Sequence, residues 1–181
     1  MAAGRGRGVD ADLGRHGGKA RRRGGAGGGT GRAPGMIDGN ADDTIQEILT
    51  TTRRIALVGA SAKPWRASHE VMRFLLDRGY DVTPVNPGLA GQTLHGRTVV
   101  ASLAEATPLE MVDVFRASMH VAALVDESIR LGARTIWMQL GVIDEAAAAK
   151  ARAAGINVVM DRCPVIEHRR IGPFGHAHTH H

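Results

Sequence analysis

The sequence predicts an α/β fold in which a doubly wound parallel sheet of about five strands forms a single domain. From residue 42 onward, short apolar runs alternate about five times with segments of helical periodicity, the pattern of a sheet with right-handed helical crossovers. Aromatic residues are only 3% of the chain. The core is therefore expected to consist of Ala, Val, Leu, Ile and Met, as in helix-covered parallel sheets. A length of 181 residues suits one such domain with extensions.

The first half of the domain contains a short helix and then one β-α-β unit. Asp42 or Asp43 is the expected cap of the short helix. Ser68 is the expected cap of the second helix, which Gly79 ends. The turn sequence Asn86-Pro87-Gly88 closes the second strand. We expect these elements at 44–51 (helix), 55–60 (strand), 68–78 (helix) and 80–85 (strand).

The second half repeats the alternation after a glycine-containing stretch, 89–101, which we expect to be a loop with a short edge piece. Pro108 stops a helical turn, and Gly132 and Gly155 end two helices, because neither residue type continues a helix well. Asp144 opens the alanine-rich helix. The expected elements are 102–106 (helical turn), 111–115 (strand), 119–131 (helix), 135–140 (strand), 144–154 (helix) and 156–160 (strand).

The net positive charge of the chain comes from its N-terminal segment. Residues 1–35 hold 13 of the 24 glycines and eight basic residues against two aspartates, whereas the remaining residues carry 15 basic and 16 acidic groups. We expect 1–35 to be a disordered Gly/Arg-rich tail. Three interpretations stay open: a nucleic-acid-binding arm, a solvated tail, or an extension that precedes a true start at Met36.

Several classes of protein are disfavoured by composition. A single cysteine, Cys163, allows no internal disulfide framework and agrees with a reducing cytoplasm, where we expect the protein to be located. No uninterrupted apolar segment approaches the length that spans a bilayer. The charged N-terminus is not followed by an apolar region, which argues against a secretory signal.

Glycine, polar, charged or cysteine residues follow the end of every predicted strand. Because the carboxyl ends of parallel strands lie at one edge of the sheet, where ligands bind near the switch point of the strand order, these residues predict one shared crevice. Small residues after the first strand let a ligand approach the backbone, and a helix beginning nearby favours an anion such as phosphate. The predicted walls are Gly59-Ala60-Ser61, Asn86-Pro87, Phe115-Arg116, Gln139-Leu140-Gly141 and Cys163.

The motifs of two common nucleotide sites are absent. Gly59 is followed by Ala-Ser-Ala, so the Gly-x-Gly-x-x-Gly fingerprint of dinucleotide sites is missing. Asn86 stands where an NAD site places a carboxylate for the ribose hydroxyls. An NAD(P)-dependent enzyme is thus disfavoured and remains the alternative. The Walker Gly-Lys-Ser/Thr of triphosphate hydrolysis is also missing.

Five motifs in order resemble the small stand-alone CoA-binding proteins of the YccU type, which are similar in fold to the CoA-binding domain of the succinyl-CoA synthetase α subunit. The resemblance covers about residues 42–171 and implies a Rossmann-like domain that binds coenzyme A, without establishing catalysis. The motifs are Val58-Gly59-Ala60-Ser61, Val85-Asn86-Pro87, Asp113-Val114-Phe115-Arg116, Trp137-Met138-Gln139-Leu140-Gly141, and Met160-Asp161-Arg162-Cys163-Pro164 with Glu167.

The resemblance also implies roles for individual residues. Ala60 and Ser61 would meet the pyrophosphate, and Asn86 would lie near the adenosine portion. The remaining binding candidates are Gly59 and Ser68 beside the first strand, the cations Lys63 and Arg66, Pro87, the flanking pair Phe115 and Arg116, and Gln139, Gly141 and Cys163. A structural explanation stays open for several: Ser61 as a helix cap, Asn86 as a turn former, Phe115 as core, and Gln139 as a satisfied strand-end amide.

Cys163 has two interpretations. It is a thiol at the ligand edge, able to exchange with the CoA thiol if Arg162 lowers its pKa, or it is a buried small apolar residue, which is the more frequent role of a free cysteine.

The expected function is a CoA-binding or acyl-CoA-binding module without catalytic residues, with the NAD(P) enzyme second and an RNA-associated protein third. We expect no membrane partner and no metal. A homo-oligomer or partner enzyme stays open. The histidines at 176, 178, 180 and 181 belong to a His-rich tail, 172–181, expected to be flexible, whose metal affinity would be adventitious.

Overall fold

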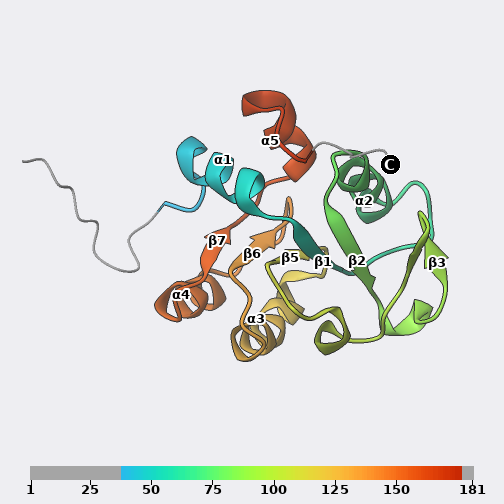
Figure 1. Cartoon of the computed structure of the whole chain (residues 1–181). Coiled ribbons are helices and arrows are strands. Elements are labelled where there is room, and N and C mark those ends of the chain that lie inside the picture. Colours follow the sequence, from blue (N-terminus) through green and yellow to red (C-terminus); the bar gives the residue numbers. More distant parts are fainter. Residues whose placement is uncertain (1–37, 177–181) are drawn as a thin grey trace, which may run out of the picture. The chain divides into compact units, whose positions relative to one another are not determined.

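The computed structural model of the chain describes residues 38–176. They form a five-stranded parallel sheet of order β2-β1-β5-β6-β7, as Figure 1 shows. The strands are β1 (Arg54–Val58), β2 (Asp81–Val85), β5 (Met111–Val114), β6 (Thr135–Met138) and β7 (Asn157–Val159). The predicted single α/β domain with a doubly wound sheet is confirmed. The expected tail 1–35 lies outside the described residues, so its interpretations stay predictions.

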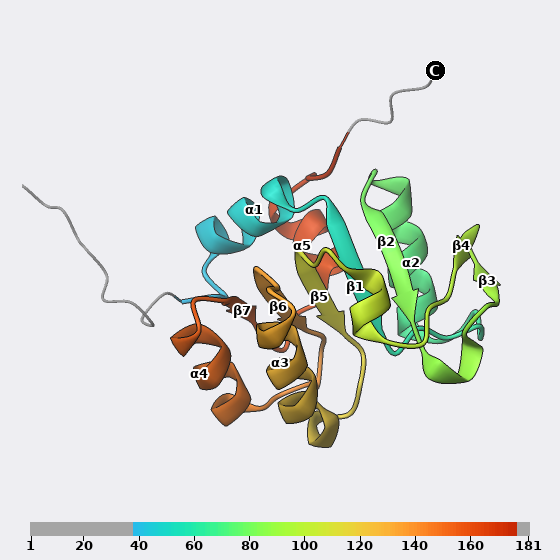
Figure 2. The ribbon, with the colours of Figure 1, turned by 60° about the horizontal axis from the view of Figure 1, so that its bottom comes forward.

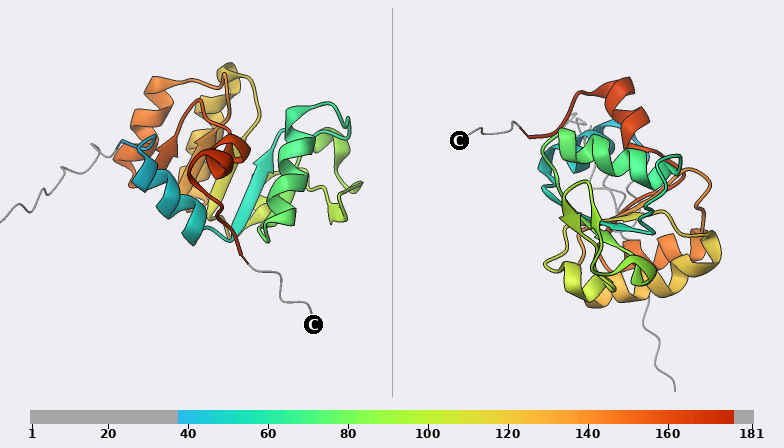
Figure 3. Two further views of the ribbon diagram at one scale, coloured as in Figure 1. Left: turned by 90° about the horizontal axis from the view of Figure 1, so that it is seen from above. Right: turned by 90° about the vertical axis from the view of Figure 1, so that its right-hand side faces the viewer.

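Helices cover both faces of the sheet (Figure 3, right). One face carries α1 (Asp42–Thr51), α2 (Ala67–Asp77) and α5 (Pro164–Ile171), and the other carries α3 (Val121–Arg130) and α4 (Glu145–Ala153). The connections include the short 3-10 helices η1 (Pro87–Leu89), η2 (Leu103–Ala106) and η3 (Ser118–His120), with Ser102 and Glu105 forming a capping box at η2. This burial of the sheet on both faces is why its strands are continuous apolar runs.

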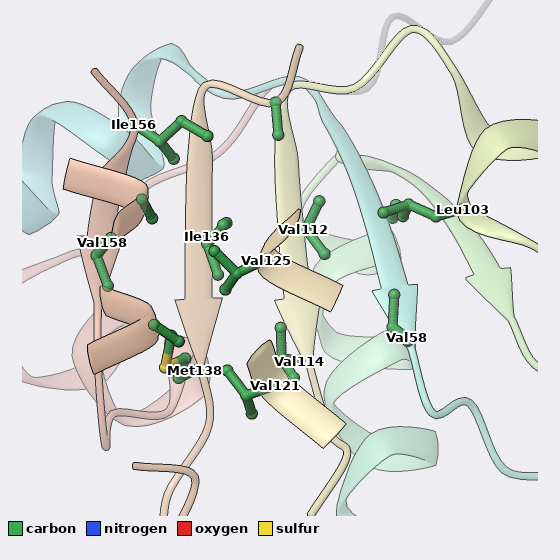
Figure 4. Packing of buried hydrophobic residues seen from close by; sticks show 14 of the residues in the cluster. Val58, Leu103, Val112, Val114, Val121, Val125, Ile136, Met138, Ile156 and Val158 are labelled. Atoms are coloured by element: carbon green, nitrogen blue, oxygen red, sulfur yellow. The ribbon is translucent and has the colours of Figure 1, made fainter. Parts of the chain in front are cut away.

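The core consists of two layers that alternate along each strand. In β5, Val112 and Val114 point toward α3 and α4, whereas Met111 points toward α1 and α5. Figure 4 shows the first layer, in which Val121 and Val125 of α3 pack over Val112, Val114, Ile136 and Met138. Aliphatic side chains fill both layers, as the low aromatic content predicts, with Trp137 and Tyr80 as the large exceptions in the second layer.

Two helix caps differ from the prediction. Helix α1 begins after Ala41 without a side-chain cap, because the Asp42 carboxylate instead binds the Arg170 guanidinium of α5, with Nη1 3.0 Å from Oδ2. Helix α2 begins at Ala67 with Arg66 at the cap position, so Ser68 lies inside the first turn and is not the cap. Asp144 does cap α4, since its Oδ1 accepts the Ala147 N–H at 3.0 Å.

Two elements were not expected in this form. The stretch 89–101 contains a small hairpin, β3 (Thr93–Leu94) with β4 (Arg97–Thr98), whose turn places His95 and Gly96 at positive φ. Helix α5 was not predicted, because its eight residues are evenly divided between apolar and polar types and are too few to show a clear periodicity. Pro164 starts this helix at a position that needs no backbone donor, and Val165 packs into the second core layer.

The ordered packing continues past residue 171, where the expected His-rich tail begins. The Phe174 N–H donates to Nδ1 of His168 at 3.1 Å, and the His176 N–H donates to the Arg78 carbonyl at 2.8 Å. Burial holds the pKa of His168 down at about 4, so this ring is neutral near pH 7. The first residues of the expected tail therefore lie against α2 and α5, while 177–181 lie outside the described residues.

Gly79 offers a test of this docking. It has a φ of +87°, and a Cβ built there lies 2.3 Å from the His176 carbonyl oxygen. Gly132 has a nearly equal φ of +80° with nothing within 4 Å. We expect Gly132→Ala to lower the free energy of unfolding by about 1–2 kcal/mol through backbone strain alone. Gly79→Ala should lower it clearly more, and urea unfolding measures both losses.

In a chain shortened to end at Gly172, the two substitutions should lower the free energy of unfolding equally, because the His176 carbonyl that the added methyl group would meet is removed. Equal costs in the full chain would contradict the docking of 172–176.

Candidate functional site

The switch point of the sheet lies at β1. The chain passes from β1 through α2 to β2 on one side and then crosses to β5 on the other side of β1. The loops that leave the carboxyl ends of β1 and β5 therefore diverge over opposite faces of the sheet (Figure 2). In open parallel sheets this divergence creates the ligand crevice.

Two hollows lie at this point, one on each face of β1. The first has a volume of about 580 Å³, and the second has a volume of about 330 Å³. Gly59 and Arg116 line both of them, so the hollows adjoin at the strand end, and we call the two together the crevice. The first hollow collects most of the predicted residues: Gly59, Ala60, Ser61, Lys63, Arg66, Ser68, Asn86, Phe115 and Arg116. Pro87 lines the second hollow.

Gly59 brings the two walls of the crevice together. It leaves the strand with a φ of +92°, and a Cβ built there lies 3.1 Å from the Phe115 carbonyl oxygen. The Gly59 N–H donates to the Val85 carbonyl at 3.0 Å. Only glycine combines this conformation with this approach at no cost. The same change of conformation ends β1 at Val58, two residues earlier than predicted.

The N-terminus of α2 opens into the first hollow, where Arg66, Ala67 and Ser68 are lining residues. The cap residue Arg66 makes no side-chain capping bond, and this eleven-residue helix directs its positive end toward the hollow. Ser61 does not cap a helix. Its Oγ accepts the Lys63 N–H at 3.1 Å, which shapes the loop before α2.

The electrostatic character of the first hollow is positive. Lys63, Arg66 and Arg116 line it, and no acidic residue within 38–176 does. In the part of the chain that the structure describes, none of these three cations takes part in a salt bridge. The Lys63 ammonium lies 6.0 Å from the ring centre of Trp65, a side chain that is 77% exposed. Unpaired cations beside a helix N-terminus form a site for an anion such as a phosphate group.

Asn86 has a structural role as well as a place in the wall. Its Nδ2 donates to the Ala60 carbonyl and its Oδ1 accepts the Gly88 N–H, both at 2.8 Å. The side chain thus ties the loop after β1 to the turn after β2. Phe115 is likewise shared between the hollow and the second core layer.

Three binding candidates, together with Leu140 of the predicted walls, line neither hollow. Gln139 is buried, and its Nε2 donates to Oδ1 of Asp113 at 2.6 Å, so it is the satisfied amide of the structural explanation. Gly141 turns the chain after β6 with a φ of +78° and donates its N–H to Oδ1 of Asp161 at 2.8 Å. Cys163 precedes α5 and packs against the second core layer.

The surroundings of Cys163 do not lower the pKa of its thiol, which was the condition for the exchange interpretation. Burial raises the thiol pKa, opposed by weaker hydrogen bonds from the amides of Ile166 and Val165. The Arg162 guanidinium is directed elsewhere, with Nη1 donating to the Asp161 carbonyl at 2.8 Å. A raised pKa leaves the thiol protonated at neutral pH and slow in exchange, which fits the alternative of a packed apolar residue.

Asp113 is a functional candidate that the sequence analysis did not single out. It is completely buried in β5, and Oδ2 has no hydrogen-bond partner among the described residues. Burial raises its pKa to about 7, although the bond from Gln139 acts in the opposite direction. The available signal was an acidic residue within the apolar run Met111–Phe115, since carboxylates are seldom fully buried.

Comparisons with known proteins agree with this geometry. The model of a family described as "CoA binding domain" matches residues 53–169, more than half of the chain. The chain belongs to this family. Its membership supports binding of CoA in general, as the resemblance predicted, and the described residues contain no cluster of three or more His, Cys, Asp or Glu side chains arranged for a metal.

Individual relatives of the family cover the domain almost completely. The chain is 37% identical over 125 residues to the uncharacterized protein YneT of Bacillus subtilis, spanning 68% of this chain and 91% of the relative. A hypothetical protein from Pyrococcus horikoshii matches at 41% identity with a TM-score of 0.69, covering 75% of this chain and 94% of its own. A Thermus thermophilus protein matches at 36% identity with a TM-score of 0.69, covering 72% and 98%.

No helix within residues 38–176 has both the length and the apolar character needed to cross a bilayer.

The buried carboxyl group gives a pH-dependent prediction. Its ordinary pKa of 3.8 rises to about 7 in the folded chain, so between these values the folded state holds a proton that the unfolded state releases. Asp113 therefore lowers the free energy of unfolding as pH rises from about 4 to 7. We expect the free energy of unfolding of Asp113→Asn to match that of the wild type near pH 4 and to exceed it by about 4 kcal/mol at pH 8, the free energy that a rise of the pKa from 3.8 to about 7 represents.

Urea unfolding of the wild type and of the variant from pH 4 to pH 8 measures the difference in the free energy of unfolding. The titration of His168 contributes equally to both proteins, so it does not affect this difference. A constant difference at all pH values would contradict the raised pKa.

Proposed function

We propose that this chain is a coenzyme A binding module whose crevice at the end of β1 holds the nucleotide part of CoA. The observation that carries the proposal is the first hollow, where an uncapped helix N-terminus and three unpaired cations converge and no carboxylate of the described residues competes. CoA presents a diphosphate and a further phosphate on its ribose, so a ligand of this charge matches the hollow.

Each wall of the crevice has a definite part in this proposal. The backbone of Ser61, with the start of α2, receives the diphosphate, whereas the Ala60 N–H already donates to the Val85 carbonyl at 3.4 Å. Lys63 and Arg66 neutralise phosphate charge from the loop. Arg116, which lines both hollows, stands between the phosphates and the rest of the ligand. Asn86 acts by holding the loop after β1 in place.

The geometry favours CoA over NAD(P). A dinucleotide site uses a carboxylate at the end of the second strand to accept the ribose hydroxyl bonds. Here Asn86 occupies that place, and both of its polar atoms already bind Ala60 and Gly88.

The crevice also fits a binding module better than an enzyme. Among residues 38–176, the two hollows contain a single carboxylate, Glu127, whose Oε1 lies 3.8 Å from the Arg130 guanidinium. The second hollow is also lined by His120, but within residues 38–176 no hydrogen bond joins this ring to the ion-paired Glu127, so the crevice shows no coupled acid and base. The third candidate, RNA association through residues 1–35, rests on a segment outside the described residues.

Filling the hollow tests its location. We expect Ser61→Arg to weaken CoA binding by more than tenfold, measured by isothermal titration calorimetry, because the new side chain occupies the space of the diphosphate. Thr98→Arg adds the same charge to an exposed position of β4 outside both hollows and should leave the affinity unchanged. Circular dichroism checks that both variants fold. Unchanged affinity in Ser61→Arg would refute the placement, and tighter binding of NAD than of CoA to the wild type would refute the ligand.

Arg66 and Arg73 form a matched pair on α2. Arg66 lines the first hollow, whereas Arg73 lies two turns along the helix and lines a separate groove against α5. Loss of a charge-assisted bond to phosphate costs about 1.5–3 kcal/mol, so Arg66→Ala should weaken CoA binding by roughly tenfold or more. Arg73→Ala should change it little. Binding by the wild type should also weaken with added salt, and equal effects of the two variants would show that the anion lies elsewhere.

A further inference from the structure

The exposed large hydrophobic side chains of residues 38–176 all follow the carboxyl ends of strands. These side chains are Trp65 after β1, Met119 after β5, Leu140 and Ile143 after β6, and Ile166 after β7, with exposures of 77%, 84%, 56%, 48% and 47%. Single exposed apolar residues are ordinary, but four of these five, all except Ile166 in helix α5, lie in the connections at the carboxyl edge of the sheet, which is not ordinary. This edge is the one that contains the crevice.

Three of these side chains come from neighbouring loops. Met119 belongs to η3 after β5, and Leu140 and Ile143 belong to the loop after β6. The two strands are paired to their ends, where Val114 lies opposite Met138. The Ser118 hydroxyl also joins the loops, since Oγ donates to the Gly141 carbonyl at 3.4 Å and accepts the Ile143 N–H at 3.1 Å. We call Met119, Leu140 and Ile143 the apolar rim.

The apolar rim is adjacent to residues of the crevice along the chain, although its own three residues line neither hollow. Met119 lies between Arg116, which lines both hollows, and His120, which lines the second. Beside Leu140, a Cβ built on Gly141 has nothing within 4 Å, so the space above this turn is open. The rim therefore borders the crevice on its β5–β6 side, away from α2.

We infer that the apolar rim receives the aliphatic chain of an acyl-CoA thioester, an inference that rests on the proposed function. The thiol of CoA lies at the opposite end of the molecule from its phosphates, and an acyl group extends it further. With the phosphates at α2, a chain leaving over β5 and β6 reaches the rim. Methionine is flexible enough to follow chains of different length. The ligand class is thus a short or medium aliphatic acyl-CoA.

Affinity for a series of thioesters tests the inference on the full chain. Each methylene that leaves water strengthens binding by about fourfold. Octanoyl-CoA should therefore bind at least tenfold more tightly than CoA in calorimetric titrations, with hexanoyl-CoA between them. Octanoate alone should show no comparable binding, because the nucleotide anchors the ligand.

Variants locate the effect. Leu140→Ser and Met119→Ser should reduce the preference for octanoyl-CoA over CoA by threefold or more while leaving the affinity for CoA itself unchanged. Ile166→Ser is the matched control, because Ile166 is almost as exposed as Ile143 but belongs to α5 on the other face of the sheet. It should leave both affinities as they are.

The outcomes separate the two proposals. If CoA binds and octanoyl-CoA binds no more tightly, the acyl site is refuted and the proposed function stands. If neither ligand binds, both fail. If the preference for octanoyl-CoA over CoA survives in Leu140→Ser and Met119→Ser, the acyl chain does not contact the rim and the inference is overturned. The inference is likewise overturned if these variants abolish a dimer seen by sedimentation, because the rim then contacts a second copy of the chain.

Discussion

The close approach of the loop after β1 to the end of β5, at Gly59, is the constraint on which the crevice depends. The Cβ of any other residue would lie 3.1–3.2 Å from Phe115, and the φ of +92° would add strain. Because the turn is this tight, the backbone of Ala60 and Ser61 passes directly over the switch point toward α2. The hollows on both sides of β1 share Gly59 for the same reason.

The polar residues at the sheet edge fall into two groups, those on the loops around the crevice and those buried beneath the edge. Residues on the loops after β1, β2 and β5 surround the crevice and supply positive charge. Gln139 and Asp113 instead lie beneath the edge, where the buried amide donates to the buried carboxyl group at 2.6 Å. A carboxyl group with a pKa near 7 exists partly as the neutral acid at physiological pH, which makes its burial tolerable. Polar residues at strand ends thus serve either binding or packing.

Sequence periodicity predicted the sheet and its strand-helix alternation well, because apolar runs covered on both faces of a parallel sheet leave a strong pattern. It did not predict α5, which is too short to show a clear periodicity and whose stability depends on Val165 in the core and on the Arg170 contacts with Asp42 and Glu167. It also misplaced the caps of α1 and α2. Asp42 pairs with Arg170 instead, a partner 128 residues away that local rules do not contain.

The sequence by itself determined that this is a parallel α/β domain with special residues at every strand end, and its motifs indicated the family. Both follow from local chemistry, since apolar runs, glycines and cations are visible in the chain. Only the tertiary structure decided which strand-end residues share a space. Side chains of successive residues point to opposite faces, and the order β2-β1-β5-β6-β7 places the crevice over β1. Gln139 and Cys163 consequently face the core, while Met119, Leu140 and Ile143 remain exposed beside the crevice.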